Sequence, residues 1–164
     1  MTNERIICFT GHRAIPQTER AELRRRLRAE ILRQMDAGAT VFRAGGALGF
    51  DTMAAQTVLE LREGHPEIRL ELVLPCPGQS DRWGALDISV YEEILAQADR
   101  VRYVSPYYFP GVLQLRNREL VRGASVCIGY LVDGHTHAGG TAYTVLQALA
   151  DGAEFVNLAE GYHK

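Results

Sequence analysis

Three short segments of the sequence combine glycines with polar side chains that suit the binding of an anion. They are residues 11–13 (GHR), 45–51 (GGALGFD) and 139–141 (GGT). Glycine lets a phosphate oxygen approach the backbone closely, and a helix that begins after the glycines directs its free N–H groups at the anion. Two glycine pairs of this kind favour a phosphate- or ribose-binding site over plain tight turns, although neither segment matches the dinucleotide fingerprint or the P-loop.

The polar side chains in and near these segments each have a binding role and a simpler alternative. Arg13 can donate two parallel hydrogen bonds to a phosphate, or it can form an ordinary surface salt bridge. Asp51 can accept from a ribose hydroxyl or cap the helix that follows. Arg116 and Asn117 suit a base or a phosphate, and a solvated helix face is the alternative. His12 has no carboxylate partner nearby in the sequence, which favours a structural, hydrogen-bonded histidine over an acid–base group.

Other residues that could carry chemistry give weaker signals. His135 and His137, with Asp133, lie in a glycine-flanked loop, and such a pair is weak evidence for a metal site without a third firm ligand. Aromatic residues are dense between positions 83 and 109, where one could stack on a base, although packing beneath a loop is the commoner use. We therefore assign no catalytic residue, no metal ligand, and no cofactor other than a nucleotide-like ligand.

The elements that must position these residues follow from the hydrophobic pattern. Short apolar runs alternate with longer amphipathic ones, which is typical of an α/β, Rossmann-like three-layer fold with a mainly parallel, doubly wound sheet. The predicted strands are residues 5–10, 40–44, 69–74, 100–104, 125–132 and 154–158, the predicted helices are 18–37, 51–63, 83–98, 113–123 and 141–151, and 107–111 and 133–139 are loops. Because the carboxyl ends of parallel strands share one edge, the three glycine segments should converge there.

Composition places the chain among ordinary globular proteins. Its 164 residues, of which 46% are hydrophobic and 23% charged, suit a single domain over residues 1–164. The net charge of −2 provides no electrostatic footprint for sequence-independent nucleic-acid binding, and the basic run at residues 24–28 is interpreted as a solvated helix face. Three widely spaced cysteines are expected to be buried free thiols. With neither a signal-peptide pattern nor a membrane-spanning run, a cytoplasmic location without membrane contact is expected.

Five motifs together resemble a known group of proteins. They are FTGHR at residues 9–13, GGALGFDTMAA at 45–55, LPCPGQSDRW at 74–83, LRNRELV at 115–121 and AGGTAYTV at 138–145. In this order they cover nearly the whole chain and resemble the YpsA-like branch of the SLOG superfamily. That superfamily is Rossmann-like and includes the LOG phosphoribohydrolases and the DNA-processing DprA proteins.

The resemblance implies a ligand, a site and a biological setting. The ligand would be a nucleotide or an NAD- or ADP-ribose-derived molecule, the protein a homo-oligomer, and the setting bacterial stress or cell division. The ligand contacts carried over by position are Gly11, Arg13, Gly45, Gly46, Gly49, Asp51, Arg116, Asn117, Gly139, Gly140 and Thr141. The LOG enzymes have a catalytic glutamate in a PGGxGTxxE motif, and residues 138–144 (AGGTAYT) lack it.

Three hypotheses about function follow. The leading one is a domain that binds or senses a nucleotide-like small molecule. The alternative is a nucleotide N-glycosidase that recruits Asp51, Asp133 or Glu119 in place of the missing glutamate. The third is a DprA-like nucleic-acid binder, and the nearly neutral charge argues against it.

Overall fold

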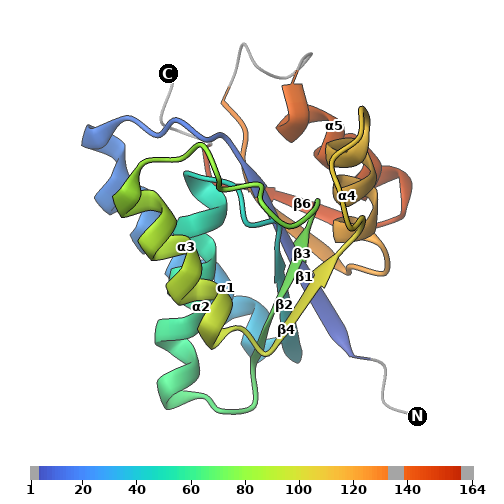
Figure 1. Cartoon of the computed structure of the whole chain (residues 1–164). Coiled ribbons are helices and arrows are strands. Elements are labelled where there is room, and N and C mark those ends of the chain that lie inside the picture. The colour runs from blue at the N-terminus through green and yellow to red at the C-terminus, as the bar shows by residue number, and fades with distance from the viewer. Residues whose placement is uncertain (1–3, 133–138, 160–164) are drawn as a thin grey trace.

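The computed structural model describes residues 4–132 and 139–159 and contains one six-stranded sheet with helices on both faces (Figure 1). The strands are β1 (Arg5–Gly11), β2 (Ala39–Ala44), β3 (Arg69–Leu74), β4 (Arg100–Tyr103), β5 (Val126–Tyr130) and β6 (Glu154–Asn157). The helices are the 3₁₀ turn η1 (Gln17–Glu19), α1 (Arg20–Asp36), α2 (Phe50–Gly64), α3 (Ala85–Gln97), α4 (Val112–Val121) and α5 (Gly139–Ala150). All neighbouring strands in this sheet pair in parallel, which confirms the predicted α/β class.

The strand order β4-β3-β2-β1-β5-β6 creates one point at which the direction of winding reverses. From β1 the chain winds outward through β2 and β3 to β4, and α1, α2 and α3 lie together on one face (Figure 1). It then returns to pair β5 with the other side of β1, so α4 and α5 cover the opposite face. In sheets of this kind ligands bind beyond the carboxyl ends of the two strands at the reversal, which here are β1 and β5.

The sheet is buried on both faces, as the continuous apolar runs of its central strands require. Along β1, Ile7 and Phe9 join the larger core beneath α1 and α2, whereas Cys8 faces the smaller core beneath α4 and α5. Cys8 lies opposite Cys127 of β5, and both are free, buried thiols, as is Cys76. The neighbouring Cys8 thiol and burial together raise the pKa of Cys127 well above its ordinary value. The prediction of buried, unpaired cysteines is confirmed.

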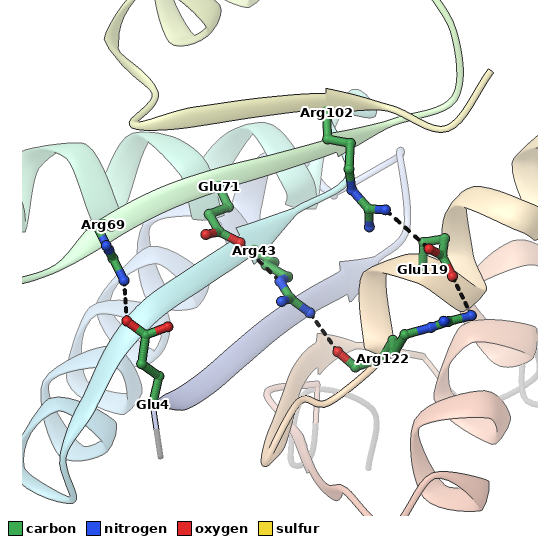
Figure 2. Close-up of polar contacts among 7 residues, drawn as sticks. All are labelled: Glu4, Arg43, Arg69, Glu71, Arg102, Glu119 and Arg122. Carbon is green, nitrogen blue, oxygen red and sulfur yellow. Dashed lines mark hydrogen bonds and ion pairs between the residues drawn. The ribbon is translucent and has the colours of Figure 1, made fainter. Parts of the chain in front are cut away.

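On the face of the sheet that α4 and α5 cover, the half formed by β2, β3 and β4 carries charged side chains (Figure 2). Arg43 of β2 pairs with Glu71 of β3 at 3.2 Å and donates to the carbonyl oxygen of Arg122 at 2.6 Å. The Glu119 carboxylate of α4 pairs with Arg102 at 3.1 Å and with Arg122 at 2.7 Å. These partly exposed pairs connect α4 to the sheet edge, and each is worth only about 0–1 kcal/mol.

The boundaries of the elements differ from the predicted ones by one or two residues at most ends. One difference changes the chemistry: α5 begins at Gly139, which was predicted as the last residue of the preceding loop, and not at Thr141. Among the helices in the described part of the chain, none has both the length and the hydropathy needed to cross a membrane.

Candidate functional site

A cavity of about 430 Å³ lies at the carboxyl end of β1, beside the start of α5, the helix that follows β5, and we call it the first cavity. Its walls come from the loops after β1 and β2 and from α4 and α5. The lining residues are Thr10, Gly11, His12, Arg13, Ala47, Asp51, Leu113, Arg116, Asn117, Leu120, Gly140, Thr141 and Thr144. Seven of the predicted site residues are therefore brought together, from positions as distant as 11 and 141.

Arg116 is a buried cation whose position is set by two hydrogen bonds. Only 7% of the residue is exposed, although it lines the cavity from α4. Its Nη1 donates to the carbonyl oxygen of Gly45, and its Nε donates to Asn117 Oδ1 at 2.8 Å. Within residues 4–132 and 139–159 its Nη2 has no hydrogen-bond partner, so this group can donate to an anionic ligand. The alternative of a solvated helix face is wrong for Arg116 and Asn117, since both are buried.

Asp51 lies on the cavity wall with 6% of its surface exposed. Burial raises the pKa of its carboxyl to about 6, although Arg116, the Ala47 N–H and Arg13 each act to lower it. The Oδ2 atom accepts from the backbone N–H of Ala47 at 3.2 Å. The predicted N-cap role is wrong, because α2 begins one residue earlier with Gly49 as its N-cap, and Asp51 lies in the first turn.

Arg13 is exposed and has neither a hydrogen bond nor an ion pair within the described ranges 4–132 and 139–159. The surface salt bridge proposed as its alternative is therefore absent from this part of the structure. The loop that carries Arg13 is held by backbone hydrogen bonds from Phe50 to the His12 carbonyl at 3.2 Å and from His12 to Tyr130 at 3.3 Å. The Val132 N–H also donates to His12 Nε2 at 3.0 Å, which confirms the structural role predicted for this histidine.

The N-terminus of α5 forms another wall of the first cavity. Gly140 and Thr141 line the cavity, and as first-turn residues of a helix their N–H groups have no intrahelical acceptor. The positive end of the helix dipole lies at the same place. Gly139 starts the helix but is not part of the lining.

The glycines after β2 do not line the first cavity but pack against residues that do or that lie next to it. A Cβ atom on Gly45 would lie 3.1 Å from both Asp51 Oδ2 and Arg116 Nη1, so glycine lets these two groups pack against the backbone. Gly46 faces away from the first cavity, toward Leu74. Gly49 has φ of +81°, and a Cβ there would overlap the Arg13 carbonyl oxygen. The backbone of residues 11–13 thus rests directly on Gly49.

A second cavity, of about 570 Å³, has Arg13 and Leu113 in common with the first. It is lined by Arg13, Pro75, Cys76, Pro77, Gly78, Gln79, Asp81, Arg82, Trp83, Tyr108 and Leu113. Except for Arg13, none of these residues was among the predicted contacts. The sequence signal was the dense aromatic segment around residues 83–109, which periodicity alone cannot separate from core packing.

A metal centre has no support in the described part of the chain. Residues 4–132 and 139–159 contain no group of three or more histidine, cysteine, aspartate or glutamate side chains able to hold an ion. His135, His137 and Asp133 lie outside these residues.

A parallel sheet of this winding, with a cavity between the end of β1 and the start of α5, defines a Rossmann-like domain. The chain belongs to the YspA SLOG family, whose sequence profile matches residues 8–151. It is 33% identical over 127 residues to a UPF0398 protein of Bacillus pumilus, covering 70% of this chain and 66% of that one. It is also 32% identical over 114 residues to a UPF0398 protein of Halalkalibacterium halodurans, covering 68% and 58%.

Two solved structures share the fold at low sequence identity. DNA processing protein A (DprA) from Streptococcus pneumoniae has a TM-score of 0.63 at 14% identity, covering 93% of this chain and 49% of that one. DprA from Helicobacter pylori, described for its single-stranded DNA binding mode, has a TM-score of 0.64 at 19% identity, covering 93% and 64%. The chain thus spans between about half and two-thirds of the length of the proteins it matches.

Proposed function

We propose that this protein binds a nucleotide or a nucleotide-derived ligand of the NAD or ADP-ribose type in the first cavity. The observation that carries the proposal is the convergence of three anion-binding features on one cavity. These are Arg13, whose side chain has no partner among the described residues, the buried Arg116 and the N-terminus of α5. A guanidinium donates to phosphate in a forked geometry, and helix N–H groups add further donors.

The remaining walls suit the sugar part of such a ligand. Asp51 and Asn117 are buried polar groups, and Thr141 adds a hydroxyl at the start of α5. A ribose has both donors and acceptors on its hydroxyls, so it can pair with a carboxylate and an amide together. The volume of about 430 Å³ is in the range of sites for small organic ligands.

A thermal-shift screen tests the proposal directly. ADP-ribose, NAD, AMP and cyclic nucleotides at millimolar concentration are expected to include at least one compound that raises the melting temperature, because binding to the native state stabilises it. The proposal fails if none of them, and no compound of a wider nucleotide library, has this effect.

Replacing Arg13 with alanine is expected to weaken the binding of ADP-ribose by about 10- to 100-fold, the usual cost of losing charge-assisted hydrogen bonds. Isothermal titration calorimetry measures the change. Arg118→Ala is the matched control, because Arg118 is an exposed arginine of α4 that does not line the cavity. Equal affinities for the wild type and the Arg13 variant would show that Arg13 does not contact the ligand.

We propose a small molecule, not a polynucleotide, as the ligand. The Helicobacter pylori DprA binds single-stranded DNA, and it shares the fold at only 19% identity. The net charge of −2 gives this chain little general attraction for a phosphate backbone. A salt-sensitive mobility shift with single-stranded DNA would overturn this part of the proposal.

Asp51 gives specific support to a second candidate function, N-glycosidic hydrolysis of a nucleotide. It is a cavity-lining carboxyl with a pKa raised to about 6, which leaves it mostly ionised at pH 7 and able to stabilise a ribosyl cation. Glu119 is unsuited to the role because two arginines pair with it outside the first cavity (Figure 2). In this reaction water adds to the anomeric carbon as the bond to the base breaks. Release of ribose 5-phosphate from AMP, abolished in Asp51→Asn, would establish it, and no release above blank would exclude it.

A further inference from the structure

The second cavity adjoins the first, because Arg13 and Leu113 line both. Most of its wall comes from the segment that follows β3, where Pro75 and Pro77 restrict the backbone. Tyr108, from the loop between β4 and α4, also lines the cavity. A ligand whose phosphate is held by Arg13 therefore has a second space within reach on the other side of that side chain.

The walls of the second cavity suit a flat aromatic ring. Trp83 lines it and is held by an edge-to-face contact with Tyr91, with ring centroids 5.1 Å apart and an interplanar angle of 76°. Tyr108 is 69% exposed, so its ring has ample area left to cover a ligand. Nucleobases stack on indole and phenol rings of this kind.

Gln79 provides a polar group of fixed orientation in the same cavity. Its Nε2 donates to the Tyr91 hydroxyl at 3.0 Å and to the carbonyl oxygen of Gly46 at 3.4 Å. The carbonyl of Gly46 can only accept, so the amide nitrogen must face it. The Gln79 Oε1 atom has no hydrogen-bond partner within the described residues and is left as an acceptor, for example for an exocyclic amino group of a base.

We propose that the second cavity binds the nucleobase of the ligand whose phosphate occupies the first cavity, with Arg13 between the two. This inference rests on the proposed function and adds to it that the ligand is recognised at both ends. It assigns stacking to Trp83 and Tyr108 and hydrogen bonding at the base edge to Gln79. The ligand is accordingly a nucleotide with its base attached, and a sugar phosphate alone fills only the first cavity.

The fluorescence of the protein provides the first test, because Trp83 is the single tryptophan of the chain. Excitation at a wavelength that neither adenine nor the seven tyrosines absorb reports on this residue alone. ADP-ribose is expected to quench the emission in a saturable way, whereas ribose 5-phosphate is expected to bind in calorimetry and leave the emission unchanged. If ADP-ribose binds in calorimetry without altering the emission, the base does not contact Trp83 and the inference is overturned.

A pair of neighbouring tyrosines provides the second test. Tyr107 and Tyr108 are both 69% exposed, but only Tyr108 lines the second cavity. Tyr108→Ala is expected to weaken ADP-ribose binding by about 5- to 100-fold, the usual range for one stacked base, and to leave ribose 5-phosphate binding unchanged. Tyr107→Ala is expected to change neither affinity.

The outcomes separate the inference from the proposed function. If the wild type binds neither ADP-ribose nor any other nucleotide of the thermal-shift screen and the wider library, the proposed function fails, and this inference fails with it. If the wild type binds ADP-ribose but Tyr108→Ala and Tyr107→Ala bind it equally well, the function stands and the inference is wrong. A loss of ribose 5-phosphate binding in Tyr108→Ala would also contradict it, because the substitution would then act on the first cavity.

Discussion

Replacing Gly49 with alanine is expected to lower the free energy of unfolding by about 3 kcal/mol or more. The residue has φ of +81°, which costs an L-amino acid side chain energy even where there is space. Here there is none, because the new Cβ would overlap the backbone carbonyl of Arg13. The clash is with main chain, so no side-chain rotation can relieve it, and the loop at residues 11–13 must move.

Gly38→Ala is the matched control for the Gly49 variant. Gly38 also has a positive φ, of +98°, but a Cβ there would meet no atom within 4 Å. Its replacement is expected to lower the free energy of unfolding by only about 1 kcal/mol, because only the backbone conformation is unfavourable there. Urea denaturation measures both values. Equal losses in the two variants would contradict the importance of the contact between Gly49 and the Arg13 backbone.

Replacing Asp51 with asparagine is expected to change how the stability depends on pH. Burial raises the pKa of this carboxyl from 3.8 to about 6 in the folded protein, so the native state binds the proton more tightly than the unfolded chain does. The stability associated with the protonated carboxyl is fully present below pH 4 and is lost as the pH rises through about 6. The raised pKa corresponds to a change of about 3 kcal/mol, which the asparagine variant should not show.

The measurement is a series of urea denaturations between pH 4 and pH 8 on the wild type and the variant. Relative to the wild type, Asp51→Asn is expected to become more stable as the pH rises, with most of the change between pH 4 and pH 6.5. Glu60→Gln is the control, because Glu60 is an exposed carboxylate of the same helix α2 that does not line the first cavity. A constant difference between the wild type and Asp51→Asn across this range would show that the carboxyl is not desolvated as described.

Local sequence pattern was enough to predict the fold of this chain. Buried runs such as residues 69–74 and amphipathic runs such as residues 18–37 differ in length and in hydrophobic period, and each signal is read within one segment. The start of α5 was harder to predict, because a pair of glycines is usual in turns. Gly139 keeps the positive φ, of +91°, that favours glycine, and the helix starts at this pair, where Thr144 Oγ1 donates to the Gly140 carbonyl.

The meeting of Arg13, Arg116 and Gly140 at one cavity could also be predicted, since parallel strands place all their carboxyl ends at one edge of the sheet. The sequence could not predict which glycines would line that cavity. Their orientation depends on backbone directions, and contacts with distant parts of the chain set these directions. Gly45 and Gly49 support the site from behind, and Gly46 faces Leu74.

The sequence by itself thus determined the order of strands and helices and the edge at which polar residues gather, because both depend on periodicity along the chain. The burial of Asp51, the anchoring of Arg116 on the Gly45 carbonyl, and the sharing of Arg13 between two cavities required the folded molecule. These features arise where segments far apart in the chain exclude water from one another, and no local pattern encodes how closely two such segments will pack.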